Sequence, residues 1–208
     1  PDQNLTMMDG VEIHDPYRLF GLTSAFNPET IGRFELATGG FSVKYGDRLA
    51  SLLLVENREG NRARRLGGSA ALSITDANTV LEGALPGRAT GSWLVSARRT
   101  YYDLVASRIA GQDFPQFADL QTKLVWDLVP GRTLSLFGLR SRQDAALNID
   151  EDDARGEFND RTRNDLLSLR FDAAIGRVSH TKTIVSFSDS ASSFGVDAAF
   201  RNDSQRSN

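Results

Sequence analysis

The densest group of side chains that could do chemistry is a run of carboxylates in residues 148–160. Its acidic members are Asp150, Glu151, Asp152, Asp153, Glu157 and Asp160. Calcium takes about six to eight oxygen ligands from a shaped loop, so such a run could hold it. The EF-hand spacing is absent, because the sixth position counted from Asp150 is Arg155 rather than Gly and the twelfth is Arg161 rather than Glu. We therefore interpret the run as a solvated external loop and expect no metal site.

Two histidines are the remaining candidates for acid–base chemistry. His14 stands beside Asp15, a pair that could act as a base with an orienting carboxylate, while His180 lies in a strand-like segment far along the chain. No Gly-x-Ser-x-Gly, Walker or Gly-x-Gly-x-x-Gly motif accompanies them. The chain has no cysteine, which removes thiolate metal sites, disulfides and cysteine nucleophiles. We expect neither an enzyme nor a bound cofactor.

Charge and hydropathy exclude further classes of protein. The 208 residues carry 24 Lys+Arg against 27 Asp+Glu, a net charge of −3, so no overall basic field favours nucleic acid. The longest apolar run is residues 49–55, far short of the roughly 20 residues of a membrane helix. Membrane β-strands of about 9–11 alternating residues remain compatible with this composition. The chain begins at Pro1 and ends in a polar segment, and we expect it to be a fragment.

The second part of the chain alternates apolar and polar residues with the period of a β-strand. Residues 69–75, 80–85, 93–98, 119–128 and 166–173 each place apolar side chains on one face and polar ones on the other. A soluble sandwich buries the apolar face against a second sheet, whereas a transmembrane barrel turns it toward lipid. Alternation alone does not separate the two.

The connections between these segments alternate in length. Short turns at 86–88, 129–132 and 175–177 interleave with long excursions at 101–117 and 143–160. Outer-membrane barrels show this pattern, because their turns are short on one side and their loops long on the other. The first connection, at 75–78, departs from it because it is short. Residues 101–109 break the strand period and predict a short helix within the first long excursion.

A boundary near residues 60–65 divides the chain. The first 60 residues carry nine acidic and five basic side chains in short elements with scattered Gly and Pro, unlike the regular strands that follow. We predict one domain over 1–60 and a second over 61–208. Arg62, Arg64 and Arg65 then lie in a solvated connection.

The first domain carries a series of short motifs. Asp9-Gly10-Val11 predicts a strand with a turn, and Asn27 is a helix N-cap ahead of Ile31-Gly32-Arg33-Phe34-Glu35-Leu36. Tyr45-Gly46 follows, and residues 16–22 are expected to form a loop or a single helical turn. In order and spacing these motifs resemble the C-terminal half of the plug domain of TonB-dependent outer-membrane receptors. Residues 91–103 resemble the first barrel strands of that family, whereas Asp47 departs from the small residues common there.

The resemblance implies an all-β fold with minor helix: a partial plug domain followed by about seven antiparallel strands of an incomplete transmembrane β-barrel. A complete barrel of this kind has about 22 strands, so seven would form a curled open sheet. The implied function is active transport of a scarce or bulky nutrient, of the siderophore, cobalamin or oligosaccharide type, across the outer membrane of a Gram-negative-type cell. The implied partners are TonB, through a segment missing here, outer-membrane lipid and the transported molecule; a surface lipoprotein is a further partner that the resemblance allows.

Site residues follow from the same resemblance. Residues 14–20 lie where the family places an apical plug loop, so Tyr17, Arg18 and Phe20 are predicted to face ligand. Turn packing of the two rings and an Arg18–Asp15 pair are the alternatives. Polar residues of the alternating strands are predicted to face the lumen as wall or plug-docking residues: Glu82, Arg98, Asp119, Gln121, Lys123, Arg170 and Asp172.

A secreted soluble β-sandwich that binds carbohydrate or protein is the rival interpretation, and a hydrolase is a distant third. Six apolar residues discriminate between barrel and sandwich: Leu120, Leu124, Trp126, Leu167, Leu169 and Phe171. In a sandwich they pack against a second sheet. In a barrel they form one continuous exposed belt.

Overall fold

The computed structural model describes residues 4–13, 17–18, 23–24, 26–39, 51–101, 116–151, 154–176 and 178–200. Over these ranges the chain is all-β, and the helix described is a single 3-10 turn, Pro28–Thr30. Among the described residues, no helix has the length and apolar character needed to cross a membrane.

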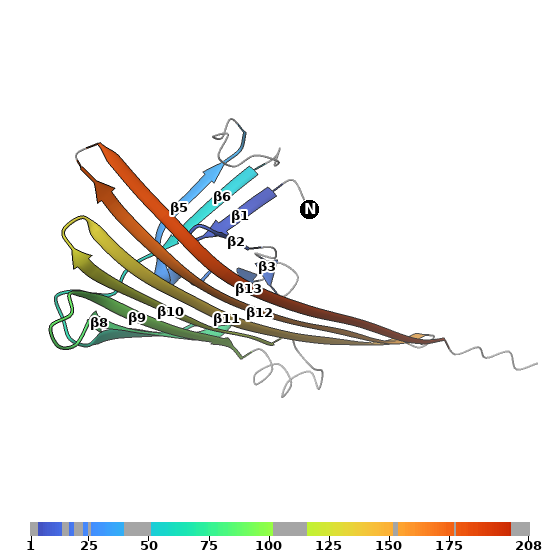
Figure 1. Ribbon diagram of the computed structural model, residues 1–208. Helices are drawn as coiled ribbons and strands as arrows, with labels where there is room; N and C mark the ends of the chain where they lie inside the picture. Colours follow the sequence, from blue (N-terminus) through green and yellow to red (C-terminus); the bar gives the residue numbers. More distant parts are fainter. Residues whose placement is uncertain are drawn as a thin grey trace, which may run out of the picture.

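One large sheet dominates the fold. Its seven antiparallel strands follow one another along the chain in the order β13-β12-β11-β10-β9-β8-β7, so β7 and β13 are its edges (Figure 1). The strands are β7 (Gly67–Leu72), β8 (Asp76–Ala84), β9 (Gly91–Thr100), β10 (Gln116–Val129), β11 (Arg132–Glu151), β12 (Ala154–Ile175) and β13 (Ser179–Phe200). The predicted set of antiparallel strands is confirmed, and the sheet is curved and open.

Tight turns join the strands at one end of the sheet. The predicted short connections at 86–88, 129–132 and 175–177 are confirmed, with left-handed backbone at Gly87, Gly131 and Gly176. The connection expected at 75–78 is placed too late, because β8 begins at Asp76. The Ser73 hydroxyl accepts the amides of Thr75 and Asp76 at 3.0 Å each, which closes the turn earlier. The helix predicted over 101–109 lies outside the described residues except for Tyr101.

The prediction of a long loop over 143–160 is wrong. β11 and β12 remain paired as far as Glu151 opposite Ala154, and their long ends continue with β13 well past the rest of the molecule (Figure 1). Loss of alternation and the dense charge suggested a loop. Backbone hydrogen bonds between paired strands do not depend on side-chain type, however, so a dense run of charged residues does not exclude a strand. The carboxylate run therefore lies largely in two paired strands rather than in a calcium-type loop.

A second, smaller sheet is built from the first part of the chain, in the order β2-β1-β6-β5. Its strands are β1 (Asn4–Met8), β2 (Val11–Glu12), β5 (Ile31–Ala37) and β6 (Ser51–Asn57). The turn predicted at Asp9-Gly10 is confirmed; φ is 49° at Asp9 and 89° at Gly10, the conformation of a two-residue hairpin. β1 pairs in parallel with β6, which brings the two ends of this segment side by side. We call these four strands the N-terminal sheet.

Two further predictions concern residues 14–30. The loop or helical turn predicted over 16–22 lies outside the described residues except for β3 (Tyr17–Arg18), which pairs with β4 (Thr23–Ser24) in a two-residue ladder. The predicted N-cap is confirmed, because the Asn27 side chain accepts the Glu29 amide at 3.1 Å at the start of the 3-10 turn.

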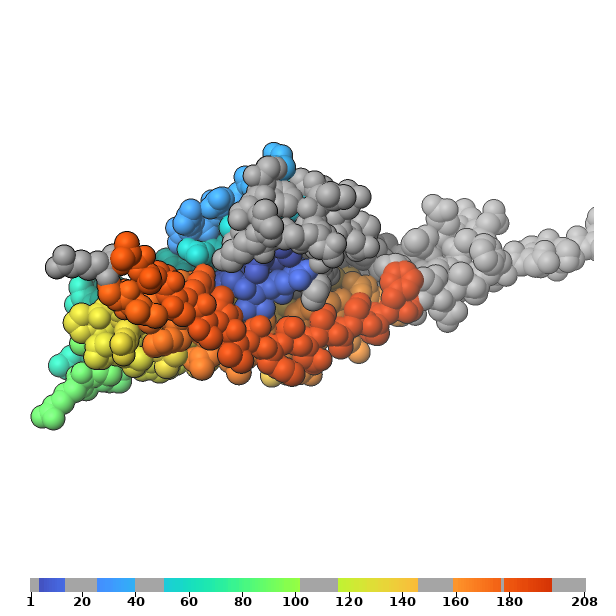
Figure 2. All heavy atoms as spheres, turned by 45° about the horizontal axis from the view of Figure 1, so that its top comes forward, coloured from blue at the N-terminus to red at the C-terminus, as the bar shows by residue number. Residues whose placement is uncertain are grey.

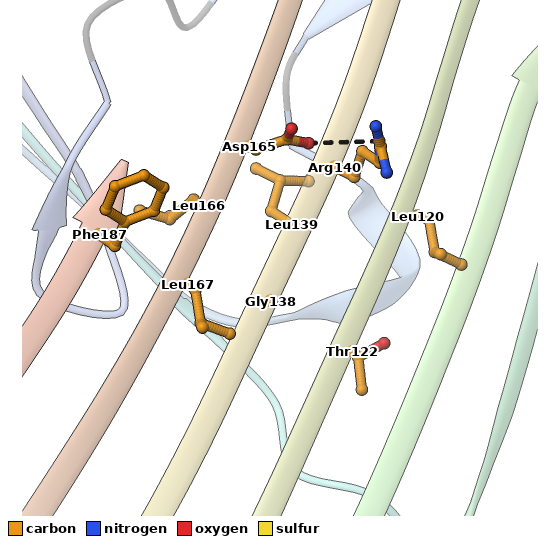
Figure 3. Close-up of a pocket in the computed structure, with 9 residues that line it drawn as sticks. All are labelled: Leu120, Thr122, Gly138, Leu139, Arg140, Asp165, Leu166, Leu167 and Phe187. Atoms are coloured by element: carbon orange, nitrogen blue, oxygen red, sulfur yellow. Dashed lines mark ion pairs between the residues drawn. The ribbon is translucent and has the colours of Figure 1, made fainter. Parts of the chain in front are cut away.

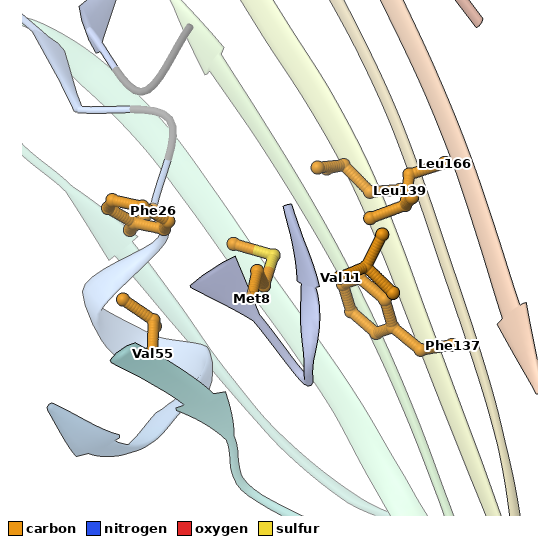
Figure 4. Packing of buried hydrophobic residues seen from close by; sticks show 7 residues of the cluster. All are labelled: Met8, Val11, Phe26, Val55, Phe137, Leu139 and Leu166. Carbon is orange, nitrogen blue, oxygen red and sulfur yellow. The ribbon is translucent and has the colours of Figure 1, made fainter. Parts of the chain in front are cut away.

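The hydrophobic core lies between the N-terminal sheet and the inner face of the large sheet. Met8, Val11, Phe26 and Val55 from the N-terminal region meet side chains of β11 and β12 (Figure 4), which are Phe137, Leu139 and Leu166. Ile184 of β13 packs against this cluster, and in Figure 2 the N-terminal residues lie directly against the β13 edge. The N-terminal sheet therefore occupies the hollow of the curved sheet.

The outer face of the large sheet carries an apolar belt. Three rows of residues in register define it: Leu81, Val95, Thr122, Gly138, Leu167 and Phe187; Gly83, Trp93, Leu124, Leu136, Leu169 and Val185; Trp126, Leu134, Phe171 and Thr183. None of these residues is charged. Leu120, Leu167, Leu169 and Phe187 are exposed, and the N-terminal sheet packs on the opposite face. The six discriminating residues thus share one outward face that none of the described elements buries.

Candidate functional site

Polar side chains of β8 to β10 meet the N-terminal region inside the hollow. We call this set the polar interface. It consists of Asp9, Asn27, Thr30 and Asn57 on one side and Asn78, Ser96, Arg98, Asp119, Gln121 and Lys123 on the other. All ten residues are buried. Buried polar groups are costly unless they are hydrogen-bonded, so the partners of each decide what the interface can do.

A salt bridge fixes the Asp9 turn. The Lys123 ammonium donates to Asp9 Oδ1 at 3.0 Å and also to the main-chain carbonyl of Asn57. The Asp9 carboxylate in turn accepts the Asn57 main-chain N–H at 3.1 Å and its side-chain amide at 3.0 Å. One lysine of β10 therefore holds both the β1–β2 turn and the end of β6.

The helix cap Asn27 makes a second contact with the wall. Its side-chain amide donates to Ser96 Oγ at 2.6 Å and to Asn78 Oδ1 at 3.1 Å, and it accepts from Asn78 Nδ2 at 2.8 Å. The amide is completely buried and still caps the 3-10 turn. One side chain thus orders a local turn and binds two neighbouring strands.

Thr30 connects the same turn to β10. Its hydroxyl lies 2.9 Å from the Gln121 side-chain oxygen and 3.1 Å from that of Asn57. Arg98 and Asp119 form a further ion pair at 2.6 Å beside it, and Arg98 also donates to the Phe26 carbonyl at 3.3 Å. The guanidinium lies 5.0 Å from the Phe117 ring centre, within cation–π range.

The segment that joins the two sheets is exposed at Arg62, Arg64 and Arg65, as predicted for a solvated connection, and ion pairs also anchor it to the sheet. Arg58 pairs with Glu82 of β8 and donates to the Glu29 carbonyl at 2.8 Å, while Arg62 pairs with Asp127 and Glu59. The Arg62 guanidinium donates hydrogen bonds to Asp127 and to Glu59, and these raise its pKa above the ordinary value. These ion pairs tie the connection to the turn end of the large sheet.

A glycine in this segment permits close approach to the sheet. A Cβ on Gly60 would lie 2.0 Å from the Trp93 carbonyl oxygen. No side chain can be accommodated at that distance without moving the backbone.

The seven residues predicted to face a lumen all lie on the inner face of the large sheet. Glu82, Arg98, Asp119, Gln121 and Lys123 contact the N-terminal region or its connection, or pair beside it. Arg170 and Asp172 pair with each other at 2.5 Å on β12. Of the predicted ligand-facing residues, Tyr17 and Arg18 have described backbone only, and Phe20 lies outside the described residues, as do His14 and Asp15.

Sequence reasoning missed the partners on the N-terminal side. The sequence indicates only a capping role for Asn27 and predicts no contact for Asn57 or Thr30. A signal exists for Asn57, because it is a polar residue at a buried position at the end of an apolar strand. For the part of the chain that is described, no cluster of three or more histidines and carboxylates could hold a metal ion. The polar interface has hydrogen bonds and ion pairs suited to docking one sheet on another.

The fold thus belongs to the class in which a small mixed sheet fills the hollow of a curved antiparallel meander.

No protein-family model and no curated protein matches the sequence. Among solved structures, the siderophore receptor PirA from Pseudomonas aeruginosa is similar over 94% of this chain, with 16% identity and a TM-score of 0.47. A variant of the ferric enterobactin receptor PfeA from the same organism matches over 92%, with 13% identity and a TM-score of 0.45. The chain spans about two fifths of the length of these proteins, 41% and 38% respectively.

Proposed function

We propose that this chain is part of a TonB-dependent outer-membrane receptor that takes up a scarce or bulky nutrient. Residues 1–60 would form the C-terminal part of its plug and residues 61–208 the first strands of its transmembrane barrel. The observation that carries the proposal is the pairing of an uncharged outer belt with a hollow that holds a separate sheet through buried polar contacts. A soluble sandwich has the opposite arrangement, with its apolar faces inside.

The belt has the dimensions of a membrane-spanning band. Along β11 it is bounded by Arg132 and Arg140, eight positions apart on the same face. Eight residues at about 3.3 Å each, tilted by about 40°, cover roughly 20 Å. Arginine side chains at both margins can extend toward the headgroups, which brings the width near the band of about 25 Å found in such barrels.

The polar interface suits a sheet that must move. A buried hydrogen bond contributes only about 0.5–1.5 kcal/mol net, because both partners bind water again when they separate. A dry apolar interface regains nothing on separation. With the N-terminal sheet displaced, Gln121, Lys123, Asn78 and Ser96 would leave a hydrophilic wall for a water-filled passage. Force from TonB on the plug would act on contacts of this kind.

Recognition of the nutrient is assigned to the plug loop around β3 and β4. Tyr17, Arg18 and Phe20 remain the proposed ligand-facing residues. The proposed partners are TonB, outer-membrane lipid and the transported molecule, which is of the siderophore, cobalamin or oligosaccharide type.

The absence of cysteine allows a direct test. The variant Asn27→Cys/Ser96→Cys places two thiols, in a stretch of 208 residues that otherwise has none, at positions whose side chains now meet through a hydrogen bond of 2.6 Å. Native host cells carrying this variant would be given a panel of radiolabelled ferric siderophores, cobalamin and oligosaccharides. Uptake of one compound should require the gene and the proton gradient, stop on oxidation of the thiols and return on reduction.

The same cells provide the control and the contrary result. The single variant Ser96→Cys should transport equally in oxidising and reducing medium. Uptake that is unchanged by deletion of the gene for every compound, or that continues through the oxidised double variant, would exclude a plug-gated transporter.

A further inference from the structure

A row of arginines crosses the outer face just beyond the apolar belt. Strand register places Arg99, Ala118, Arg142, Arg163 and Ala191 side by side on β9 to β13. This row contains three cations and no carboxylate. Arg142 and Arg163 face each other directly across β11 and β12, and like charges in that position destabilise a sheet. An unfavourable pair of this kind becomes favourable when an anion binds between the two guanidinium groups.

The neighbouring carboxylates compensate only one member of this pair, Arg163. Asp165, one row nearer the belt, binds both Arg163 and, at 3.4 Å, Arg140. Asp144, one row farther out, pairs with Arg161 at 2.5 Å. Arg142 is exposed and makes no hydrogen bond or ion pair with the described residues. Arg142 is therefore able to bind an external anion.

An apolar groove lies on the belt side of this row and ends at the Arg140–Asp165 pair, one row nearer the belt (Figure 3). It has a volume of about 270 Å³ and is lined by Leu120, Thr122, Leu167 and Phe187, with Gly138 at its centre and the Arg140–Asp165 pair at one end. Gly138 leaves the groove open, because a Cβ there would only reach van der Waals distance, 3.8 Å, from Leu167. The groove belongs to the belt, so what enters it must be apolar.

We propose that this groove and the arginine row form a binding site for a phosphorylated lipid. An acyl chain would lie in the groove along Gly138, and the phosphate would bridge Arg142 and Arg163. The two parts are placed as a lipid requires, since the row lies one residue pair beyond the margin of the belt, at the level of the headgroups. The inference rests on the proposed membrane location of the belt but is independent of what is transported.

Lipid retention on the purified, detergent-solubilised protein tests the site. Native mass spectrometry would compare dioleoyl phosphatidic acid, dioleoyl phosphatidylcholine and inorganic phosphate. The intact protein should retain phosphatidic acid at least tenfold better than phosphatidylcholine, and Arg142→Ala should remove about that factor. Arg132→Ala is the matched control, because Arg132 lies on the same face of the same strand at the other margin of the belt. Gly138→Leu, which fills the groove, should weaken retention with both arginines intact.

Three results would overturn the proposal. Equal retention of the two lipids would show that the groove binds acyl chains without selecting a phosphate. Equal loss in Arg132→Ala would show that the arginines act only by non-specific charge attraction. Saturation by inorganic phosphate without lipid would leave a free-anion site. Arg142→Ala should not alter uptake in cells, so failure of the lipid site and failure of the transport function appear in separate assays.

Discussion

Replacing Lys123 by methionine removes the cation that holds the Asp9 turn to the large sheet. Asp9 and Lys123 are 5% and 9% exposed, so the remaining carboxylate would stay buried with only two donors, both from Asn57. Breaking a buried ion pair from one side typically costs about 3–5 kcal/mol, most of it the penalty of the uncompensated charge. The equilibrium between docked and undocked N-terminal sheet should therefore shift by roughly two to three and a half orders of magnitude.

The double variant Asp9→Asn/Lys123→Met separates charge from shape. Asparagine tolerates the left-handed backbone at position 9, where φ is 49°, and can still bind Asn57. Because no charge is left buried, the double variant should cost only about 1–2 kcal/mol, which makes the two substitutions strongly non-additive.

Hydrogen exchange of the amides of β1 and β6 in the detergent-solubilised protein measures these free energies. The control is Arg33→Met, which removes one member of the exposed Arg33–Glu35 pair and should change exchange by less than about 0.5 kcal/mol. If Lys123→Met costs under about 1 kcal/mol and adds simply to Asp9→Asn, the salt bridge does not dock the sheet and the reasoning fails.

Three further substitutions probe other parts of the molecule. Asn27→Ala should raise exchange in β8 and β9 and destabilise docking by about 2–3 kcal/mol, because it removes a cap and leaves the buried Asn78 and Ser96 side chains short of a partner. Gly60→Ala should prevent folding, seen as loss of the protease-resistant form, while Gly195→Ala, which has open space around it, should fold normally. Leu169→Lys in the belt should cost about 2–4 kcal/mol in urea titration of the lipid-embedded protein. Gln116→Lys, on the same face beyond the belt and opposite Asp144, should be near neutral; equal costs would argue against membrane insertion of the belt.

Much of the large sheet could be predicted because a membrane-type strand has two very different faces. Leu120 and Leu124 alternate with Gln121 and Lys123, and this pattern alone identifies β10 and the direction of each side chain. The pattern fails over 143–160, where the charged Asp144 faces outward opposite Arg161. There the strands are held by backbone hydrogen bonds, which do not depend on residue type and therefore cannot be predicted from it.

The candidate site was only half accessible from sequence. The alternation of side chains along β8 to β10 places Arg98 and Gln121 on the inner face, but it does not identify the residues that they contact. Their partners depend on the parallel pairing of β1 with β6 and on the position of the Asn27 cap, which are set by contacts between residues far apart in the chain. Single polar residues such as Thr30 carry no periodic signal from which such contacts can be read.

The hollow of the large sheet holds the N-terminal sheet by two different kinds of contact, and this determines how the two can separate. On the β11–β12 side the contact is apolar, through Phe137, Leu139 and Leu166, each of which loses about 1.5–3 kcal/mol when exposed to water. On the β8–β10 side the contact is polar, and water can replace much of it. A force applied to the N-terminal sheet therefore meets less resistance at β8–β10, so separation should begin there and leave β11 and β12 in contact until last.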